Sequence, residues 1–513
     1  MGIAADWSKC FHAEGGCFVV DQPTESCKCI FIDAQIVLMR SFIKEDETWK
    51  DYVRRTFFAM ISRHFATYDT VVISFDWYAN VPIYKSLQQA SRTARSKPGF
   101  SFDSRQTLPP IPPDPSIWPQ ALMNRDFKTK LIDLITKTIL SEYTPPRRNV
   151  TLLVDFVNVT QITWKPITMN YASQEPVRTV LTDMLPMGEG DVKFLRFIAL
   201  YGDLLVDSVD SDCLLIAAHY IVRHNYTKNL YIRRYKTRVP DAPTKAFRVV
   251  GKGPPCGAGA LTGPGGALKG PGGIAGCLQG PLQVACGKSA LPAKRTFGVM
   301  ATQGAPSGGS TAPRPKLEYE IVHVNMLVEM LHLSMRQAVP RNIHTGDAVH
   351  LNAVLIFVVL LCGCDYSKKL PRIGVKGVWE RLHILVPALL TSTSYTENVF
   401  AVDVDQTINT MVSGLYASAF SKHVDAKHAG NMDAVLLQLQ GSKLAAKTRE
   451  DMPTPESLRT MILNIEWVIN YWAIENGDPV CKTDGSNGFC LIDNKLVWGV
   501  STHSSEPIEP KLD

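Results

Sequence analysis

Three short apolar runs, each joined to an aspartate, constrain the fold most. The runs are CIFIDAQIV at 29–37, TVVISF at 70–75 and TLLV at 151–154, and the acids that go with them are Asp33, Asp76 and Asp155. Each run predicts a buried strand, and helical patterns such as 46–64 and 125–141 lie between or after them. Strands that alternate with helices predict an α/β fold with a mostly parallel central sheet flanked by helices. Sites in such sheets form outside the carboxyl ends of the strands, where these acids are expected.

Length and composition bound the class of protein. At 513 residues the chain is long enough for two lobes, or for one large domain with insertions. Hydrophobic residues make up 45% and charged residues 20%, which is typical of a globular protein with a sizeable core. The net charge of +6 is compatible with a polyanionic partner such as nucleic acid, but it does not require one.

The sequence predicts neither a secreted protein nor a membrane-spanning one. The start at 1–6 lacks the charged-then-apolar pattern of a signal peptide, so the 12 cysteines are expected to be reduced thiols. The longest apolar run, AVLIFVVLLCGC at 353–364, is too short to span a bilayer and predicts a buried core helix.

Two segments interrupt the alternation. Residues 97–119 are rich in proline and predict an irregular loop. Residues 251–316 hold 17 of the 35 glycines and neither Asp nor Glu, so we interpret them as a flexible, solvated insertion. The C-terminal third is helical by pattern, and 458–475 is expected to be a core helix.

The strongest motif of chemical interest is the stretch MGEGDVKFLRFIALYGDLLVDSVDSDCLL at 187–215. Glu189 and Asp191 follow glycines at the expected start of a helix, where the helix dipole favours carboxylates. Nineteen positions after Asp191 comes the pair Asp210 and Asp212, again before an apolar run. Carboxylate clusters bind hard ions such as Mg²⁺, and two such ions about 4 Å apart promote phosphodiester hydrolysis.

These motifs resemble those of a known family. The run G-E-G-D, followed after eighteen residues by D-S-D-C-L-L, resembles the internal motif of the flap-endonuclease and XPG-type 5′ nucleases. The segment LCGCDYSKKLPRIGVKGVWERL at 361–382 is similar to the family's G-S/C-D-Y…G-I-G…K/R-A element. The start Met1-Gly2-Ile3 and the acids in IFIDAQ and VISFDW also match. The five matches occur in the family order and cover about residues 1–97, 183–235 and 345–385.

The resemblance implies a PIN-like 5′ nuclease fold with a helix-two-turn-helix, a helical C-terminal region and a site for two Mg²⁺ ions, with Mn²⁺ as a substitute. The implied ligands are Asp33, Asp76, Glu189 and Asp191 for one ion, and Asp210, Asp212 and Asp365 for the second. Asp155 has no counterpart in the family pattern, so we expect it to be structural.

Two basic residues are implied to contact the scissile phosphate. Lys85 and Arg92 are seven apart, which places them on one face of a helix, and Arg95 is a third candidate. They begin two residues later than in the family pattern, so a small insertion is expected within 77–82.

The segment after Asp365 is implied to bind a DNA duplex. Backbone at Gly374, with Lys376 following, would bind a phosphate together with a K⁺ ion. The sequence departs from the family by placing Arg372 where a glycine usually stands, which weakens the inference of a K⁺ site. The remaining implied DNA contacts are Lys368, Lys369 and Gly2.

The expected organisation has six parts. They are a nuclease region at 1–97, an arch or cap at 98–182, a second nuclease region at 183–250, the glycine-rich insertion at 251–316, the end of the nuclease core with the helix-two-turn-helix at 317–385, and the helical region at 386–513.

The leading functional prediction is a monomeric, structure-specific 5′ nuclease that acts on DNA with a 5′ flap, a nick or a free 5′ end. The resemblance implies the nucleus as its compartment, with the cytoplasm as the alternative. A 5′-3′ exoribonuclease of the XRN type, and a catalytically inactive nucleic-acid-binding relative, stay open as alternatives. The sequence contains no match to the clamp-binding motif Q-x-x-L/I-x-x-F-F.

Overall fold

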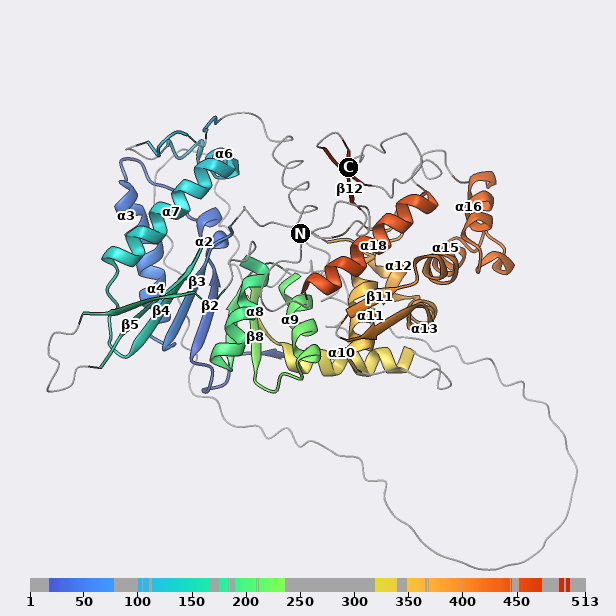
Figure 1. Cartoon of the computed structure of the whole chain (residues 1–513), viewed down its shortest axis with the longest axis horizontal. Coiled ribbons are helices and arrows are strands. Elements are labelled where there is room, and N and C mark those ends of the chain that lie inside the picture. Colours follow the sequence, from blue (N-terminus) through green and yellow to red (C-terminus); the bar gives the residue numbers. More distant parts are fainter. Residues whose placement is uncertain are drawn as a thin grey trace, which may run out of the picture. The chain divides into compact units, whose positions relative to one another are not determined.

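The fold is taken from a computed structural model of the chain (Figure 1). It describes residues 18–77, 100–103, 105–109, 113–166, 175–182, 184, 190–208, 210, 212–235, 319–338, 348–364, 367, 369–397, 399–442, 444, 452–472, 489–492 and 495–498. Contacts divide the chain into two units, Met1–Ala242 with Leu317–Asp513, and Pro243–Lys316. The second unit, which contains the predicted glycine-rich insertion, lies outside the described residues.

A large mixed sheet forms the centre of the first unit. Its strand order is β1-β9-β8-β7-β2-β3-β4-β5-β6, and the run from β8 to β4 is parallel throughout. The strands are β1 (Val19–Val20), β2 (Cys29–Asp33), β3 (Thr70–Ser74), β4 (Val150–Asp155), β5 (Val159–Trp164), β6 (Val177–Leu181), β7 (Leu204–Asp207), β8 (Leu230–Tyr235) and β9 (Tyr319–His323). The outer strands pair antiparallel at both ends. The prediction of an α/β fold with a mostly parallel central sheet is therefore confirmed.

Helices cover both faces of this sheet. One face packs in a core cluster with α2 (Ala34–Arg40), α3 (Trp49–Val53), α4 (Ala59–His64), α6 (Trp118–Met123) and α7 (Arg125–Glu142). The other face packs against α8 (Gly190–Tyr201), α9 (Asp212–Arg223) and α10 (Val324–Ala338). The division follows strand alternation, because Ile30 and Ile32 belong to the first cluster while Phe31 belongs to the second.

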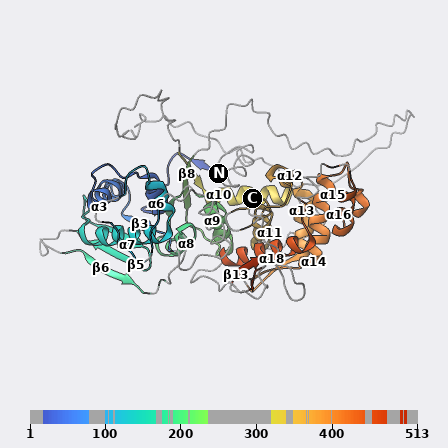
Figure 2. The same cartoon turned by 90° about the horizontal axis from the view of Figure 1, so that it is seen from above.

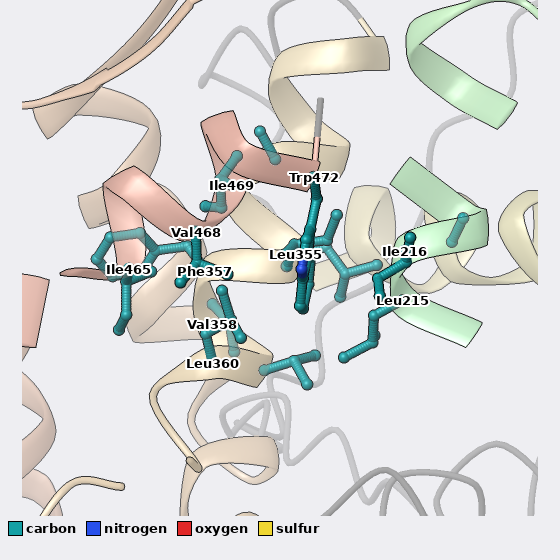
Figure 3. Packing of buried hydrophobic residues seen from close by; sticks show 14 of the residues in the cluster. Leu215, Ile216, Leu355, Phe357, Val358, Leu360, Ile465, Val468, Ile469 and Trp472 are labelled. Atoms are coloured by element: carbon teal, nitrogen blue, oxygen red, sulfur yellow. The ribbon is translucent and has the colours of Figure 1, made fainter. Parts of the chain in front are cut away.

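The second cluster continues into the C-terminal helices, which therefore share a core with the sheet. Their bounds are α11 (Ala348–Leu360), α12 (Val375–Trp379), α13 (Leu382–Ser392), α14 (Val404–Thr407), α15 (Ser413–Ala419), α16 (Met432–Gly441) and α18 (Pro455–Trp472). Figure 2 shows α9, α10 and α11 side by side, in agreement with their contacts. Figure 3 shows Leu355 of α11 in one group of buried side chains with Ile216 of α9 and Trp472 of α18. Every residue from 351 to 360 is buried, as the apolar run predicted.

Two hairpins, two π-helical turns and one 3-10 turn complete the described elements. The hairpins are β10 (Thr393–Thr396) with β11 (Val399–Val402), and β12 (Phe489–Ile492) with β13 (Lys495–Trp498). The π-helical turns are at Arg54–Phe58 and Ile408–Val412, and the 3-10 turn is at Ala426–His428. Within the described residues, none of the helices is both long and apolar enough to cross a bilayer.

One sequence-based boundary needs correction. The run at 29–37 is a strand only as far as Asp33, because the Asp33 carboxylate accepts the amide hydrogen of Gln35 and starts α2. The described part of 98–182, for which an arch or cap was predicted, contributes α6, α7 and the strands β4 to β6 to the sheet and its cover.

Candidate active site

A row of polar side chains crosses four neighbouring parallel strands at their carboxyl ends. Asp33 of β2 pairs in register with Ser74 of β3, and Ser74 with Asp155 of β4. On the other side of β2, Ile32 pairs with Asp207 at the end of β7, so Ser208 comes next to Asp33. Residues two positions earlier, such as Phe31, pack with α8 and α9. Since side chains alternate along a strand, this polar row faces the same two helices.

The acidic half of the row is organised around the Ser208 hydroxyl. This hydroxyl donates to Oδ2 of Asp33 at 3.3 Å and accepts the amide of Asp210 at 3.2 Å. Oδ1 of Asp210 in turn accepts the amide of Asp212 at 3.0 Å, where α9 begins. Asp33 is 8% exposed and Asp212 is 4% exposed. Two predicted ligands, Asp33 and Asp212, are thus buried, and hydrogen bonds run from the Asp33 carboxylate through Ser208 and Asp210 to the backbone amide of Asp212.

The other half of the row is a buried ion-pair network centred on Asp155. Its carboxylate accepts from the Ser74 hydroxyl at 3.1 Å, from Nζ of Lys193 at 3.3 Å and from a guanidinium nitrogen of Arg196 at 2.8 Å. Asp155 and Lys193 are nearly inaccessible to solvent. A buried charge of this kind is stable only when its partners satisfy it, as they do here. These contacts confirm the structural role that was expected for Asp155.

Lys193 also donates hydrogen bonds to the backbone just after β3 and just after β4. Its ammonium donates to the carbonyl of Phe75 at 2.6 Å and to that of Phe156 at 3.1 Å, in addition to Asp155. Burial lowers the pKa of Lys193. The carboxylates of Asp155 and Asp76 both oppose that shift, since each favours the charged ammonium. Asp76 itself is half-buried, directly after β3.

The segment expected to bind duplex DNA is a hydrogen-bonded turn between α11 and α12. Cys362 forms an isolated bridge with Lys369, and Gly363 between them has φ +82°. A Cβ at Gly363 would lie 2.7 Å from the Lys369 nitrogen, so only glycine fits. Arg372 has φ 60°, a left-handed conformation, at the position where the family pattern has glycine. Gly374 caps α12 with ordinary φ −90°, and nothing lies within 4 Å of its added Cβ.

Several predicted site residues lie outside the described part of the chain. They are Gly2, Lys85, Arg92, Arg95, Glu189, Asp365 and Lys368. Asp191 is the second residue of α8, but its side chain is not described. Lys369 and Lys376 are exposed, and Lys376 lies 3.7 Å from Glu380 one helical turn later.

The carboxylates that the structure describes do not by themselves make a finished metal site. Among the described residues, no three His, Cys, Asp or Glu side chains gather in an arrangement that could hold an ion. The proposed seven-carboxylate set therefore depends on Glu189, Asp191 and Asp365 in addition to the acids of the polar row.

Sequence reasoning missed Ser208, Lys193 and Arg196. Ser208 is an ordinary residue type between two acidic segments, and no pattern distinguishes it. Lys193 and Arg196 did leave a signal, because two cations three residues apart interrupt an otherwise apolar helix. All positions from 192 to 198 are buried, so these two cations require buried acceptors.

Comparison with known proteins adds no family assignment. The chain matches no protein-family model, and no curated protein matches its sequence.

Proposed function

We propose that the chain is a Mg²⁺-dependent 5′ nuclease with a PIN-like core, acting on branched or 5′-ended DNA. The observation that carries the proposal is the linkage of Asp33, Asp210 and Asp212 through Ser208 at the carboxyl edge of a parallel sheet. This edge is where α/β folds form their sites. The order of the acids along the chain, and their resemblance to the 5′ nucleases, support the same function.

The donor chemistry of the proposed ligands fits a hard divalent cation, because all seven are carboxylates. When bound, a pair of Mg²⁺ ions would activate a water molecule and neutralise charge on the scissile phosphate. The Asp33 carboxylate is held by the Ser208 hydroxyl and by burial, so little rearrangement of Asp33 is needed on binding, and Asp212 is buried as well. Asp76, Glu189, Asp191, Asp210 and Asp365 complete the proposed set.

Basic residues supply the proposed contacts with DNA. Lys369, Arg372 and Lys376 are exposed around the turn that precedes α12, where they can reach duplex phosphates. A K⁺ ion at this turn, Lys85 and Arg92 at the scissile phosphate, and nuclear DNA as the substrate belong to the same proposal.

The test is cleavage of 5′-labelled substrates by the full chain, with Mg²⁺ and with EDTA. The panel contains a 5′ flap, a nicked duplex, a bubble, single-stranded DNA and single-stranded RNA. We expect Mg²⁺-dependent cleavage of the flap or nicked duplex, and a loss of more than about a hundredfold in Asp212→Asn, since even outer-shell changes at metal sites cost 10–100-fold.

Asp405→Asn is the matched control. Asp405 belongs to another D-x-D pair, but it is exposed and pairs with Arg459 on the surface. This variant should cleave like the wild type. Cleavage that resists EDTA, or equal cleavage by Asp212→Asn, would contradict the proposal. Stepwise digestion of RNA in preference to DNA would favour the exoribonuclease alternative, and DNA binding without cleavage would favour an inactive relative.

A further inference from the structure

The two peptide groups on either side of Phe75 are both held by hydrogen bonds. The amide of Phe75 donates to the carbonyl of Asp155 at 2.8 Å, and the carbonyl of Phe75 accepts from Lys193 at 2.6 Å. The Phe75 ring is buried and packs 5.7 Å from the ring of Phe57. The direction in which the chain leaves β3 is therefore set by these contacts, and the next residue is Asp76.

Lys193 uses its full donor capacity in this arrangement. An ammonium group has three hydrogens, and its three acceptors are the carbonyls of Phe75 and Phe156 and the carboxylate of Asp155. The first two acceptors lie at the exits of β3 and β4. Lys193 thus joins two strand ends to α8, the helix that also carries Asp191.

We propose that Lys193 is a positioning residue, which sets the place of Asp76 in the acidic site by holding the Phe75 carbonyl. The inference rests on the proposed metal-dependent function, since Asp76 is one of the proposed ligands. The Asp155 carboxylate holds the Lys193 side chain beside that carbonyl, and Arg196 is the second cation that pairs with Asp155. Lys193 itself is inaccessible to solvent and contacts neither substrate nor metal in this proposal.

The experiment compares two variants of α8 that disturb the same carboxylate. Lys193→Met removes the bond to Phe75, while Arg196→Met removes the other cation that pairs with Asp155. For the wild type and both variants, Mn²⁺ affinity is measured by electron paramagnetic resonance, and the free energy of unfolding is measured by urea without metal. Neither readout requires cleavage activity.

We expect both variants to be destabilised, since each leaves a buried charge short of a partner. Mn²⁺ affinity should fall about tenfold or more in Lys193→Met and less than about threefold in Arg196→Met, in line with outer-shell effects at metal sites. If Lys193→Met does not fold, Lys193→Gln replaces it, because the amide retains a donor and should give an intermediate affinity.

Two outcomes overturn the inference, and they can be told apart. If both variants lose Mn²⁺ affinity equally, or neither does, the network is a structural ion pair and Lys193 has no special role. If the wild type itself does not bind Mn²⁺, the proposed function fails, and the positioning role fails with it.

Discussion

The hydroxyl of Ser208 lies 3.3 Å from Oδ2 of Asp33, although the two residues are 175 positions apart in the chain. The same hydroxyl accepts a hydrogen bond from the backbone amide of Asp210 at 3.2 Å, so one small side chain contacts the Asp33 carboxylate and the backbone of a second acid of the proposed site. Hydroxyl and carboxylate together present only oxygen atoms, which is the donor set that Mg²⁺ prefers.

Ser208→Ala should therefore weaken metal binding as well as the fold. Loss of its two hydrogen bonds costs about 2 kcal/mol of stability, and loss of the orienting contact to Asp33 costs about tenfold or more in metal affinity. Isothermal titration with Mn²⁺ and urea unfolding measure the two effects. Ser74→Ala is the control, because it removes a buried hydroxyl of the same row that donates to Asp155 instead. A larger drop in affinity for Ser74→Ala than for Ser208→Ala would contradict this assignment.

Gly363→Ala should lower the free energy of unfolding by roughly 3 kcal/mol. The φ of +82° is unfavourable for alanine, and the added Cβ would lie 2.7 Å from the Lys369 nitrogen. Gly374→Ala in the same segment should cost less than about 1 kcal/mol, because its φ is −90° and its surroundings are open. Thermal and urea unfolding of both variants checks the contrast, and equal effects would be inconsistent with the described turn.

Arg372→Gly should change stability and DNA affinity in opposite directions. Relief of the left-handed conformation at φ 60° should raise the free energy of unfolding by about 1 kcal/mol. Loss of the cation should weaken duplex binding and reduce the salt dependence of the binding constant by about one phosphate contact. Fluorescence anisotropy at several salt concentrations provides the test. Arg372→Lys keeps the positive charge and the unfavourable left-handed conformation. It should therefore leave the free energy of unfolding and the affinity for duplex DNA near their wild-type values.

The sequence predicted the parts of the fold that local patterns encode. The apolar runs at 70–75 and 151–154 correspond to β3 and β4, and the helix expected at 125–141 is α7, which Asn124 caps. The run at 353–364 starts within α11, which ends at Leu360, and the run is buried as far as Gly363. In each case the burial of one face, or of the whole segment, determines where apolar residues occur. The pattern of apolar residues therefore predicts whether the segment is a strand or a helix.

Pairing between distant segments was beyond the same reasoning. The hairpin of β5 and β6 extends the sheet beyond β4. The alternation of residues in these strands does not indicate which strand they pair with. Lys193 is conspicuous as a cation within the apolar stretch of α8, but the sequence does not indicate that its partner is Asp155, 38 positions earlier. The acids were recognisable by type and order, whereas Ser208 and Lys193 acquire their roles only through tertiary contacts.

The stability of the fold should fall in mild acid because of a buried histidine. His219 of α9 is inaccessible to solvent, and its Nδ1 lies 3.4 Å from the Asn352 amide nitrogen of α11. Burial, followed by the nearby Arg223 and His224, lowers the pKa of His219 to about 3. In the unfolded chain the pKa of this histidine is about 6.5. Between pH 6.5 and pH 3 the unfolded state therefore binds a proton that the folded state does not bind.

The sign of the effect follows from that difference in protonation. The contribution of neutral His219 is fully present above pH 6.5 and is lost as the pH falls from 6.5 towards 3. Between pH 6.5 and 4.5 the loss amounts to about 2.5 kcal/mol, at 1.36 kcal/mol per pKa unit. His219→Gln removes this proton but not the other acid-sensitive groups. Urea unfolding should show the variant less stable than the wild type at pH 7, with the gap smaller by about 2.5 kcal/mol at pH 4.5. A gap that does not change with pH would mean that His219 is protonated alike in the folded and unfolded states.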